Sequence, residues 1–415
     1  MTFTLRRIFV AFFRIHMRIP SVSHTQKQPQ SEVLMSLLTA ARYQNVHSIR
    51  WDEAINQCGD DVIALSVADM DFEAPKPIVD AVTQRASIGN YCYTYLDDDY
   101  YSSVIDWTKS RHNWEITPEE IVAVGRMVES TPAVLRETVG VGACVVVPYP
   151  AYSPTPAAIR AAGCHVIPWN LKLNGTRYEY DFESLEFLLE DADALVITNP
   201  HNPTGRVWSE DELRRIARIA RERNVLVISD EFHMDLLHPG QRFHPYLSCI
   251  EPGDQAMSFI APGKTFNIAG LETANIIVSD PDLREKVRKG IDDAGCHNPR
   301  FFAQAATVAG YRHCADWLDE LLALVDHHTH LLDQALSDID GAALIPPEGT
   351  YLAWIDLRNT GLNDEQLESR LHQQGLVLTP GVEFGNGGSG FMRMNLAVPT
   401  PLFEKALTRL AQAFA

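Results

Sequence analysis

The sequence has few cysteines and no long apolar run, and both shortages narrow the class of protein. No apolar run approaches the ~18 residues of a membrane-spanning helix, so we expect no membrane association. The seven cysteines are odd in number and include no Cys-x-x-Cys pair. Such usage suits a reducing compartment better than a disulfide framework, so we expect a cytoplasmic protein.

Basic residues are also scarce. The sequence has 35 Lys and Arg against 54 Asp and Glu, which gives a formal net charge of −19 at pH 7. This balance argues against a nucleic-acid partner. Internal repeats and low-complexity segments are absent as well. With 415 residues, 46% of them apolar, the chain is long enough to bury a large core, and we expect two domains.

The N-terminal segment differs from the rest because it has no acidic residue before Glu32. Its apolar patch at residues 8–13 is too short for a secretory signal. Two interpretations stay open: an organelle transit peptide, or a translation start placed too early, with Met35 as the true beginning. We favour the second and expect a disordered basic extension over residues 1–34. The basic residues of this segment are Arg6, Arg7, Arg14, Arg18 and Lys27.

Strand and helix patterns alternate along the middle of the chain. The expected strands are apolar throughout, as in a sheet that is covered on both faces. Between two of them, Ser209 and Glu212 form a capping-box pattern that opens a helix over residues 213–223. We therefore expect an α/β domain with a mainly parallel central sheet and a site outside the carboxyl ends of its strands. The expected strands cover residues 143–147, 195–198, 225–229, 257–261 and 274–278.

The pattern changes after about residue 311. A long helical stretch over residues 317–335 is followed by strand patterns at 351–357 and 391–397, with a helical pattern at 364–373 between them. We expect a smaller α+β domain here. The predicted division is a large cofactor-binding domain over residues 76–310, a small domain over residues 311–415, and a segment over residues 35–75 that packs with the small domain.

Three polar side chains at the ends of expected strands form the most informative pattern. They are Lys264, Asp230 and Asn202. Separately, each has an ordinary explanation as a surface lysine, a helix cap and a turn residue. Together they suit pyridoxal 5′-phosphate (PLP), because a lysine can form an imine with its aldehyde, a carboxylate keeps its pyridine nitrogen protonated, and an amide donates to its ring oxygen. A carboxylate that ends a buried strand also needs a partner of this kind.

A series of motifs carries a resemblance to a known family. The motifs are VADMDF at 67–72, YY at 100–101 with Trp107, PAY at 150–152, NPHNPTGRVW at 199–208, SDEFH at 229–233, KTFNIAGL at 264–271, EGTYL at 348–352 and RMNLA at 393–397. The sequence resembles the fold-type I PLP-dependent enzymes of the class I/II aminotransferase superfamily. Within that superfamily it is most similar to the MalY/PatB branch of cysteine-S-conjugate β-lyases, also called cystathionine β-lyases. The likeness runs from about Arg50 to the C-terminus.

The resemblance implies a PLP-dependent carbon–sulfur β-lyase. Such an enzyme cleaves cystathionine or a related thioether amino acid to pyruvate, ammonia and a thiol, which is homocysteine when the substrate is cystathionine. The same residues suit transamination, so an aminotransferase of amino acids is the alternative. Glu272 stands where ordinary aminotransferases carry an arginine, which tells against that alternative. A PLP-binding regulatory module is a third class, but the N-terminal extension is too short for the DNA-reading domain to which such modules are fused.

The resemblance also assigns roles to individual residues. Lys264 is expected to be the catalytic residue and to bind the cofactor covalently. Arg393 is expected to clamp the substrate α-carboxylate with its planar fork, and Asp69 to line the substrate entrance or cap a loop. Tyr93 is expected to contact cofactor and substrate across the interface of a homodimer with a shared active site. The expected cofactor-binding residues are Lys264, Asp230, Asn202, Tyr152, His233, Tyr93 and Met127.

Two of these residues have more specific expectations. Tyr152 is expected to stack on the pyridine ring of the cofactor. His233 follows Asp-Glu where ordinary aminotransferases carry a tyrosine, and the resemblance marks this histidine as a feature of the lyase branch. Whether the reaction serves methionine synthesis or sulfur scavenging stays open.

Several positions depart from the family pattern. Gly263 stands where the family has a serine that donates to the phosphate, Ser66 replaces a tryptophan, and Cys92 replaces a glycine. At the phosphate end, Gly-Arg-Met at 125–127 replaces an apolar turn. We hypothesise that Arg126 supplies a positive charge opposite the phosphate and compensates for the missing hydroxyl.

Two further patterns look like binding motifs and are interpreted otherwise. GNGGSG at 385–390 fits the dinucleotide-binding pattern, but a strand is expected after it where a phosphate-binding helix would be needed. Asp-His-His-Thr-His at 326–330 looks like a set of metal ligands, but neighbouring residues of a helix point in different directions. We therefore expect a solvent-exposed helical face at 326–330 and no metal site.

Overall fold

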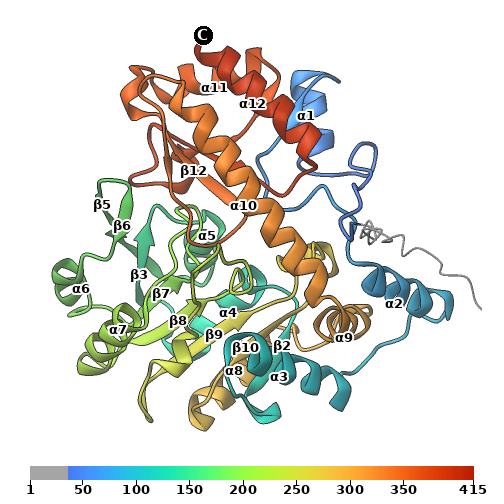
Figure 1. The fold of residues 1–415 in the computed structure, drawn as a ribbon. Helices are drawn as coiled ribbons and strands as arrows, with labels where there is room; N and C mark the ends of the chain where they lie inside the picture. Colours follow the sequence, from blue (N-terminus) through green and yellow to red (C-terminus); the bar gives the residue numbers. More distant parts are fainter. Residues whose placement is uncertain (1–35) are drawn as a thin grey trace, which may run out of the picture. The chain divides into compact units, whose positions relative to one another are not determined.

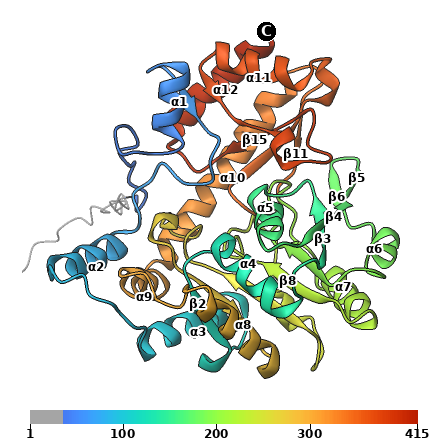
Figure 2. The same cartoon turned by 180° about the vertical axis from the view of Figure 1, so that it is seen from behind.

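The structure, a computed structural model, describes residues 36–415 (Figures 1 and 2). The extension predicted at residues 1–34 lies outside the described residues. Within residues 36–415, no helix combines the length and the apolar character that crossing a bilayer requires. The seven cysteines all lie in this part of the chain, and none of them is in a disulfide.

A seven-stranded sheet forms the centre of the larger part of the fold. Its strand order is β2-β10-β9-β8-β7-β3-β4. Neighbouring strands are parallel except where β10 runs antiparallel to β2 and to β9. The predicted α/β class with a mainly parallel sheet is confirmed. The strands are β2 (Ile121–Val124), β3 (Cys144–Tyr149), β4 (His165–Asn170), β7 (Ala194–Thr198), β8 (Leu226–Asp230), β9 (Ala256–Ile260) and β10 (Ala274–Ile277).

Helices cover both faces of this sheet. Along β3, Val145 and Val147 belong to one hydrophobic cluster and Val146 to another. The first of these clusters includes α4, α5 and α8, and the second includes α3, α7 and α9. This two-sided burial is the reason why the strands are apolar throughout. The helices of this part are α2 (Lys76–Ser87), α3 (Asp98–His112), α4 (Met127–Thr138), α5 (Pro154–Ala161), α6 (Phe182–Leu188), α7 (Glu210–Glu222), α8 (Pro281–Asp293) and α9 (Ala303–His313).

The predicted capping box is present at the start of α7. Ser209 Oγ accepts a hydrogen bond from Glu212 N at 3.3 Å, and Glu212 Oε2 accepts one from Ser209 N at 2.8 Å. The helix begins at Glu210, three residues before the predicted start, because the helical residues directly follow the N-cap. Its acidic first turn faces the positive end of the helix dipole.

The C-terminal part of the chain forms a second, antiparallel sheet with the order β11-β12-β15-β14. The helices α10, α11 and α12 accompany it, as both views show (Figures 1 and 2). The predicted smaller α+β unit is therefore present, although the exact domain bounds stay a prediction. Its elements are α10 (Ala315–Ser337), β11 (Ala343–Ile345), β12 (Leu352–Asp356), α11 (Asp364–Gln373), β13 (Leu376–Val377), β14 (Thr379–Pro380), β15 (Phe391–Asn395) and α12 (Thr400–Phe414).

The described chain begins beside this second sheet. β1 forms a short parallel pair with β13, in which Ile63 lies opposite Leu376. This pair brings α1, which precedes β1, next to the C-terminal helices in both views. The remaining elements are α1 (Trp51–Cys58), β1 (Ile63–Ala64), the hairpin β5 (Lys172–Asn174) and β6 (Arg177–Glu179), and the 3-10 turns η1 (Pro118–Glu120), η2 (Tyr246–Ser248), η3 (Ala269–Leu271), η4 (Arg358–Thr360) and η5 (Gly381–Phe384).

One expectation about α10 is wrong. The histidine-rich segment at 326–330 is not a uniformly solvent-exposed face, because His328 is fully buried. Its Nδ1–H donates to Leu396 O at 2.8 Å, and its Nε2 lies 2.9 Å from Thr400 Oγ1. Burial lowers its pKa to about 4, so the ring is neutral and Nε2 accepts from the threonine hydroxyl. His328 also stacks on Phe403, with the ring centroids 4.3 Å apart, and thus anchors α12 against α10.

Glu231, directly after β8, is a buried carboxyl group that has no cationic partner among residues 36–415. Its Oε1 accepts from Ser229 Oγ at 2.9 Å and from Tyr246 N at 2.8 Å. Its Oε2 has no hydrogen-bond partner among the described residues. Burial raises the pKa of Glu231 to about 8, so this carboxyl is largely protonated at neutral pH.

We predict that Glu231→Gln makes folding less sensitive to alkaline pH. The pKa of Glu231 is raised to about 8 in the folded protein. The protonated Glu231 side chain therefore contributes fully to the free energy of unfolding below the ordinary glutamate pKa, and this contribution is lost as the pH rises through 8. The glutamine variant cannot ionise. Urea titrations at about pH 5, 7 and 8.5 should show the free energy of unfolding of the wild type falling relative to Glu231→Gln by about 1 kcal/mol or more.

The matched control is Glu285→Gln on the exposed side of α8. Its free energy of unfolding should change with pH in the same way as that of the wild type. A difference between Glu231→Gln and the wild type that stays constant with pH would contradict the prediction.

Candidate active site

A cavity of about 700 Å³ lies at the carboxyl ends of the central parallel strands. Its wall includes Asp230 of β8, the turn that follows β9, and the start of α4. Residues of β14 and β15 from the second sheet complete it. This is where ligands bind in open α/β sheets, because parallel strands present their carboxyl ends at one edge.

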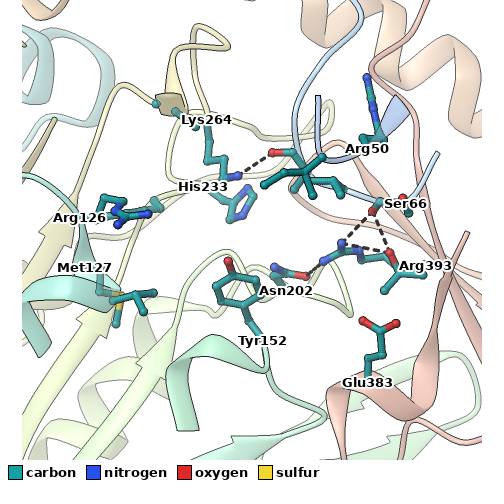
Figure 3. Close-up of a pocket in the computed structure, with 18 of the residues that line it drawn as sticks. Arg50, Ser66, Arg126, Met127, Tyr152, Asn202, His233, Lys264, Glu383 and Arg393 are labelled. Atoms are coloured by element: carbon teal, nitrogen blue, oxygen red, sulfur yellow. Dashed lines mark hydrogen bonds between the residues drawn. The ribbon is translucent and has the colours of Figure 1, made fainter. Parts of the chain in front are cut away.

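Most of the predicted site residues meet at this cavity. Figure 3 shows Arg126 and Met127 at one end and Arg393 at the other, with His233 and Tyr152 between them. Asp69 is not in the wall, although its neighbour Ala68 is. The predicted residues that line the cavity are Lys264, Asp230, Asn202, Tyr152, His233, Met127 and Arg393. Their functional roles stay predictions.

Tyr93 is placed differently from the rest. Its side chain is 93% exposed and does not reach the cavity of its own chain. A residue that acts across a dimer interface has to be accessible in this way, so the predicted role of Tyr93 stays a prediction.

Lys264 projects into the cavity from the turn after β9. Its Nζ donates to Ala68 O at 2.6 Å. Burial, together with the positive charge of Arg393, lowers the pKa of Lys264 to about 8. A sizeable fraction of the amine is therefore uncharged near neutral pH, which is the form that attacks a carbonyl.

A buried carboxylate holds the lysine turn in place. Asp235 accepts from Thr265 Oγ1, next to the lysine, at 2.6 Å. It also accepts from Trp107 Nε1 at 2.9 Å and contacts His112 Nε2 at 2.6 Å, both on α3. These hydrogen bonds keep the pKa of Asp235 below its usual value despite burial. The sequence patterns gave no sign of this contact, since its members are far apart in the chain.

Asp230 is the last residue of β8 and is buried at the cavity. Its only side-chain hydrogen bond among the described residues comes from Phe232 N, at 3.3 Å. Burial raises its pKa to about 6, although the charge of Lys264 partly opposes the shift. A cation placed against this carboxylate would relieve the cost of desolvation.

Arg393 of β15 forms the opposite end of the site. It donates from Nη1 to Asn202 Oδ1 at 3.0 Å, and from Nη2 to Ser66 O at 2.9 Å and Thr379 Oγ1 at 3.3 Å. Its buried Nε has no partner among residues 36–415. The contact with Arg393 uses the amide oxygen of Asn202 and leaves its NH2 group for another acceptor.

His233 presents a second polar atom without a partner. Its ring is buried in the cavity wall, and Nδ1 makes no hydrogen bond within the described part of the chain. Burial and the charges of Lys264 and Arg393 lower the pKa of His233 to about 3, so the ring is neutral. Unpaired buried donors and acceptors of this kind indicate a site built for a polar ligand.

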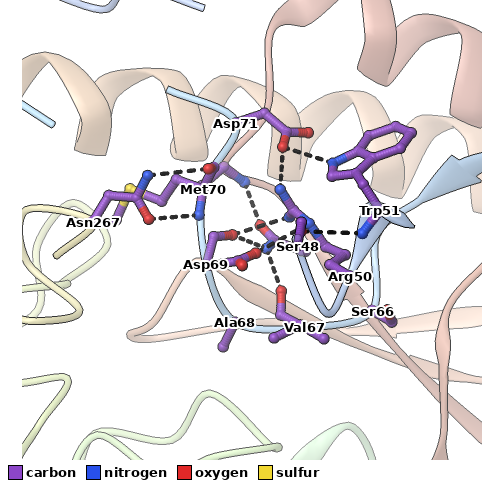
Figure 4. Close-up of polar contacts among 12 residues, drawn as sticks. Ser48, Arg50, Trp51, Ser66, Val67, Ala68, Asp69, Met70, Asp71 and Asn267 are labelled. Atoms are coloured by element: carbon purple, nitrogen blue, oxygen red, sulfur yellow. Dashed lines mark hydrogen bonds and ion pairs between the residues drawn. The ribbon is translucent and has the colours of Figure 1, made fainter. Parts of the chain in front are cut away.

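The segment at 66–72, which accepts the Lys264 amine at Ala68 O, is held by Asn267, Asn395 and Arg50; Figure 4 shows Asn267 on one side of it and Arg50 on the other. Asn267 Oδ1 accepts from Met70 N at 2.9 Å, and Asn395 Nδ2 donates to Val67 O at 2.7 Å. Arg50, which the sequence patterns did not single out, forms a buried ion pair with Asp71. Its Nε lies 3.0 Å from an Asp69 carboxylate oxygen. Asp69 thus contacts Arg50, which lines the cavity, and its predicted role at the substrate entrance stays a prediction.

The far end of the cavity carries the predicted cation at the start of α4. Arg126 is the N-cap of this helix, whose first N–H groups have no side-chain cap. Its Nε lies 3.2 Å from Glu272 Oε1, and Arg300 Nε lies 3.1 Å from Glu272 Oε2. Arg300 in turn pairs with Glu129 at 2.8 Å. Sequence reasoning missed Arg300 and Glu129, because an ion pair leaves no signal in a local pattern.

These residues fit the predicted PLP. The buried Asp230 lacks the cation that a protonated pyridine nitrogen would supply, and Asn202 keeps its NH2 group for a ring oxygen. The uncapped start of α4 provides N–H groups and a positive dipole end for a phosphate, with Arg126 beside it. Lys264 lies within the same cavity with a partly uncharged amine.

The fold and the site together define the fold-type I class of PLP-dependent enzymes. The family model for aminotransferase class I and II matches residues 60–410, and the chain belongs to this family. It is similar to cystathionine β-lyase PatB of Bacillus subtilis (strain 168), with 33% identity over 372 residues that cover 88% of this chain and 96% of PatB. Protein MalY of Escherichia coli (strain K12) is 30% identical over 373 residues, which cover 88% of this chain and 95% of MalY.

A solved structure extends the likeness to three dimensions. Cystalysin from Treponema denticola, which contains a PLP cofactor, superposes with a TM-score of 0.86 at 33% identity, over 91% of this chain and 98% of cystalysin. The predicted resemblance to the MalY/PatB branch is confirmed by these relatives.

We predict that Arg126→Ala weakens the retention of PLP. The variant removes a positive charge beside the uncapped end of α4, and an ion pair at a side chain that is 60% exposed contributes modestly, so the dissociation constant should rise about three- to tenfold. Fluorescence titration of the apoprotein with PLP measures this constant. Arg218→Ala on α7, where the arginine is similarly exposed and outside the cavity, is the control. Equal PLP affinity in Arg126→Ala and wild type would disprove the role of Arg126.

Proposed function

We propose that the chain is a PLP-dependent carbon–sulfur β-lyase that cleaves cystathionine or a related cysteine S-conjugate to pyruvate, ammonia and a thiol. The observation that carries the proposal is the meeting of Lys264, Asp230 and Arg393 at one cavity in a chain related to cystathionine β-lyase PatB. From cystathionine, the released thiol is homocysteine.

The cofactor would be held by residues of both sheets. When bound, PLP supplies an aldehyde that reacts with amines and a ring that accepts an electron pair from the substrate Cα. Asp230 would pair with the pyridine nitrogen, and the Asn202 NH2 group would donate to the ring oxygen. Tyr152, in the cavity wall, offers an aromatic face to the ring. The start of α4 and Arg126 would hold the phosphate.

The remaining work is done by two basic side chains. Arg393 binds the substrate α-carboxylate and so fixes the direction of the Cα–H bond. The Lys264 amine, whose pKa is lowered to about 8, removes the Cα proton as a general base. The Cβ–S bond then breaks, and the thiolate leaves with the bonding electron pair. Water completes the release of pyruvate and ammonia.

Transamination by the same residues is the second candidate. It needs the same base and the same carboxylate clamp, and it differs in needing a keto acid as the second substrate. Glu272 lies in the cavity wall paired with Arg126 and Arg300, where ordinary aminotransferases are expected to carry an arginine. This reversal of charge favours the lyase.

Incubation of the holoenzyme with L-cystathionine alone tests the proposal. A lyase releases pyruvate and a free thiol in equal amounts without any added keto acid. Both products are measured, pyruvate with lactate dehydrogenase and the thiol with a chromogenic disulfide. A strict requirement for a keto acid would show an aminotransferase.

The Lys264→Ala variant is the control for the assigned base. It should still bind PLP non-covalently through the remaining contacts, while turnover falls by about three orders of magnitude or more, because both the covalent attachment and the base are lost. Turnover close to that of the wild type would remove Lys264 from the mechanism.

The proposal includes a homodimer in which Tyr93 of each chain completes the site of the other. The segment before α3, which contains Tyr93, carries several large apolar side chains that are exposed to solvent. Single exposed apolar residues are ordinary, whereas a group within a short segment suggests a covered surface. The exposed residues are Ile88, Tyr91, Tyr93 and Tyr95.

We predict that Tyr93→Phe raises the dissociation constant of PLP about threefold or more while the dimer persists, because one hydroxyl donor is removed and the apolar surface is kept. Sedimentation velocity gives the oligomeric state and PLP titration gives the affinity. Tyr95→Phe in the same segment is the control. A monomeric wild-type holoenzyme would refute the shared site.

The cellular setting is also part of the proposal. Seven unpaired cysteines suit a reducing compartment, which supports a cytoplasmic enzyme of sulfur amino-acid metabolism, with methionine synthesis as one such role.

A further inference from the structure

Three glutamates in the cavity wall have no role in the proposed mechanism, and one of them, Glu383, lies near Arg393. They are Glu53 on α1, Glu368 on α11 and Glu383 in η5. Figure 3 shows Glu383 below Arg393 and beside Tyr152, with its carboxylate directed into the space between them. This part of the wall therefore faces the same volume that receives the substrate.

The fold brings the three carboxylates together from distant parts of the chain. The parallel pair of β1 and β13 holds α1, which precedes β1, and α11, which precedes β13, at the same end of the molecule, where residues of both helices line the cavity. η5 follows β14 directly and contacts β15, the strand that carries Arg393. The acidic wall is thus formed by three separate elements that pack around one cavity.

Within residues 36–415, none of the three carboxylates forms an ion pair with a lysine or an arginine, although Arg393 lies close enough to Glu383 to act on its pKa. Glu53 and Glu383 form no ion pair and no side-chain hydrogen bond there, and Glu368 has only His372, at 4.0 Å. The nearby Arg50 is already committed to Asp69 and Asp71. Partial burial raises the pKa of Glu383; the positive charge of Arg393 opposes this shift, and the negative charge of Glu368 adds to it. A positive group from a ligand would offset this charge.

Two buried polar atoms show independently that the cavity is shaped for a ligand. Arg393 Nε and His233 Nδ1 belong to side chains that are 5% exposed, line the cavity and lack a partner among residues 36–415. The α-carboxylate of an amino-acid substrate would supply the missing acceptor for Arg393 Nε. The glutamates next to it then face the groups that lie beyond the reacting bond.

We propose that Glu383, supported by Glu53 and Glu368, selects cysteine S-conjugates whose leaving thiol carries an ammonium group. This inference rests on the proposed function and adds the charge of the preferred leaving group. Substrates with a neutral leaving group are accepted less well, and those with only a carboxylate there are accepted least. The wall thereby also disfavours dicarboxylic amino acids that lack a second ammonium group, because their second carboxylate meets like charge. Cystathionine carries an ammonium group beside its second carboxylate, so its leaving group has no net charge.

A series of substrates that share one reaction tests the inference. S-(2-aminoethyl)-L-cysteine, S-propyl-L-cysteine and S-carboxymethyl-L-cysteine are close in length and differ in the charge of the leaving group. For the wild-type holoenzyme, kcat/KM should fall roughly fivefold at each step from cation to neutral to anion, mainly through KM. The spread should shrink as ionic strength rises.

Glu383→Gln keeps the shape of the side chain and removes its charge. It should compress the spread to about twofold, with little change for the neutral substrate. Glu365→Gln is the matched control, because Glu365 is exposed on the same helix as Glu368 and does not line the cavity. It should leave the order and the spread unchanged.

Binding without elimination provides a second readout. L-Lysine, 2-aminoheptanoate and 2-aminoadipate replace the sulfur of the three substrates by a methylene group, so no thiol can leave. Their dissociation constants, measured from the change in cofactor absorbance, should rise in the same order, and Glu383→Gln should compress this spread as well.

The outcomes separate the two proposals. Equal kcat/KM for all three thioethers, or a spread that Glu383→Gln leaves intact, overturns the charge selection while the lyase stands. Failure to cleave any thioether overturns the lyase, and the binding series then decides the charge selection on its own.

Discussion

A carboxylate buried at the end of a central strand, with no ion pair to any of residues 36–415, is the constraint on which this site depends. Asp230 occupies that position, and burial raises its pKa to about 6. The sheet order places β8 between β7 and β9, and all three strands run in the same direction. The loop with Asn202 and the turn with Lys264 therefore emerge beside Asp230. The parallel sheet brings together the residues predicted to bind the cofactor, and a protonated ring would offset the cost of burying the Asp230 carboxylate.

The second sheet supplies the other half of the chemistry. β15 carries Arg393, and the hydrogen bond from this arginine to Asn202 joins the substrate end of the site to the cofactor end. Asn202 is fixed by one contact in the orientation that leaves its NH2 group available. The acidic wall of Glu53, Glu368 and Glu383 belongs to the same side of the cavity. Under the two proposals, the first sheet holds the cofactor, whereas the elements around the second sheet contact the substrate.

The sequence was a good guide where local pattern determines structure. Apolar strands, the capping box before α7 and the motifs around Lys264 were placed correctly within a few residues, because they depend on neighbours in the chain. Contacts between distant segments were not predictable in this way. The ion pair of Arg50 with Asp71, the carboxylate of Asp235 beneath the lysine turn and the pair of Arg300 with Glu129 all join residues far apart in sequence. His328 shows a related limit, since a helical repeat does not reveal which polar residue turns inward to meet a later helix.

The segment at 66–72 links these two halves of the molecule. β1, which directly precedes this segment, pairs with β13. Asn395 of the second sheet and Asn267 of the lysine turn each form a hydrogen bond with the segment. In the middle of the segment at 66–72, the carbonyl of Ala68 accepts a hydrogen bond from the amine of Lys264. The hydrogen bond to Ala68 therefore ties the lysine amine to a segment that residues from both sheets hold in place.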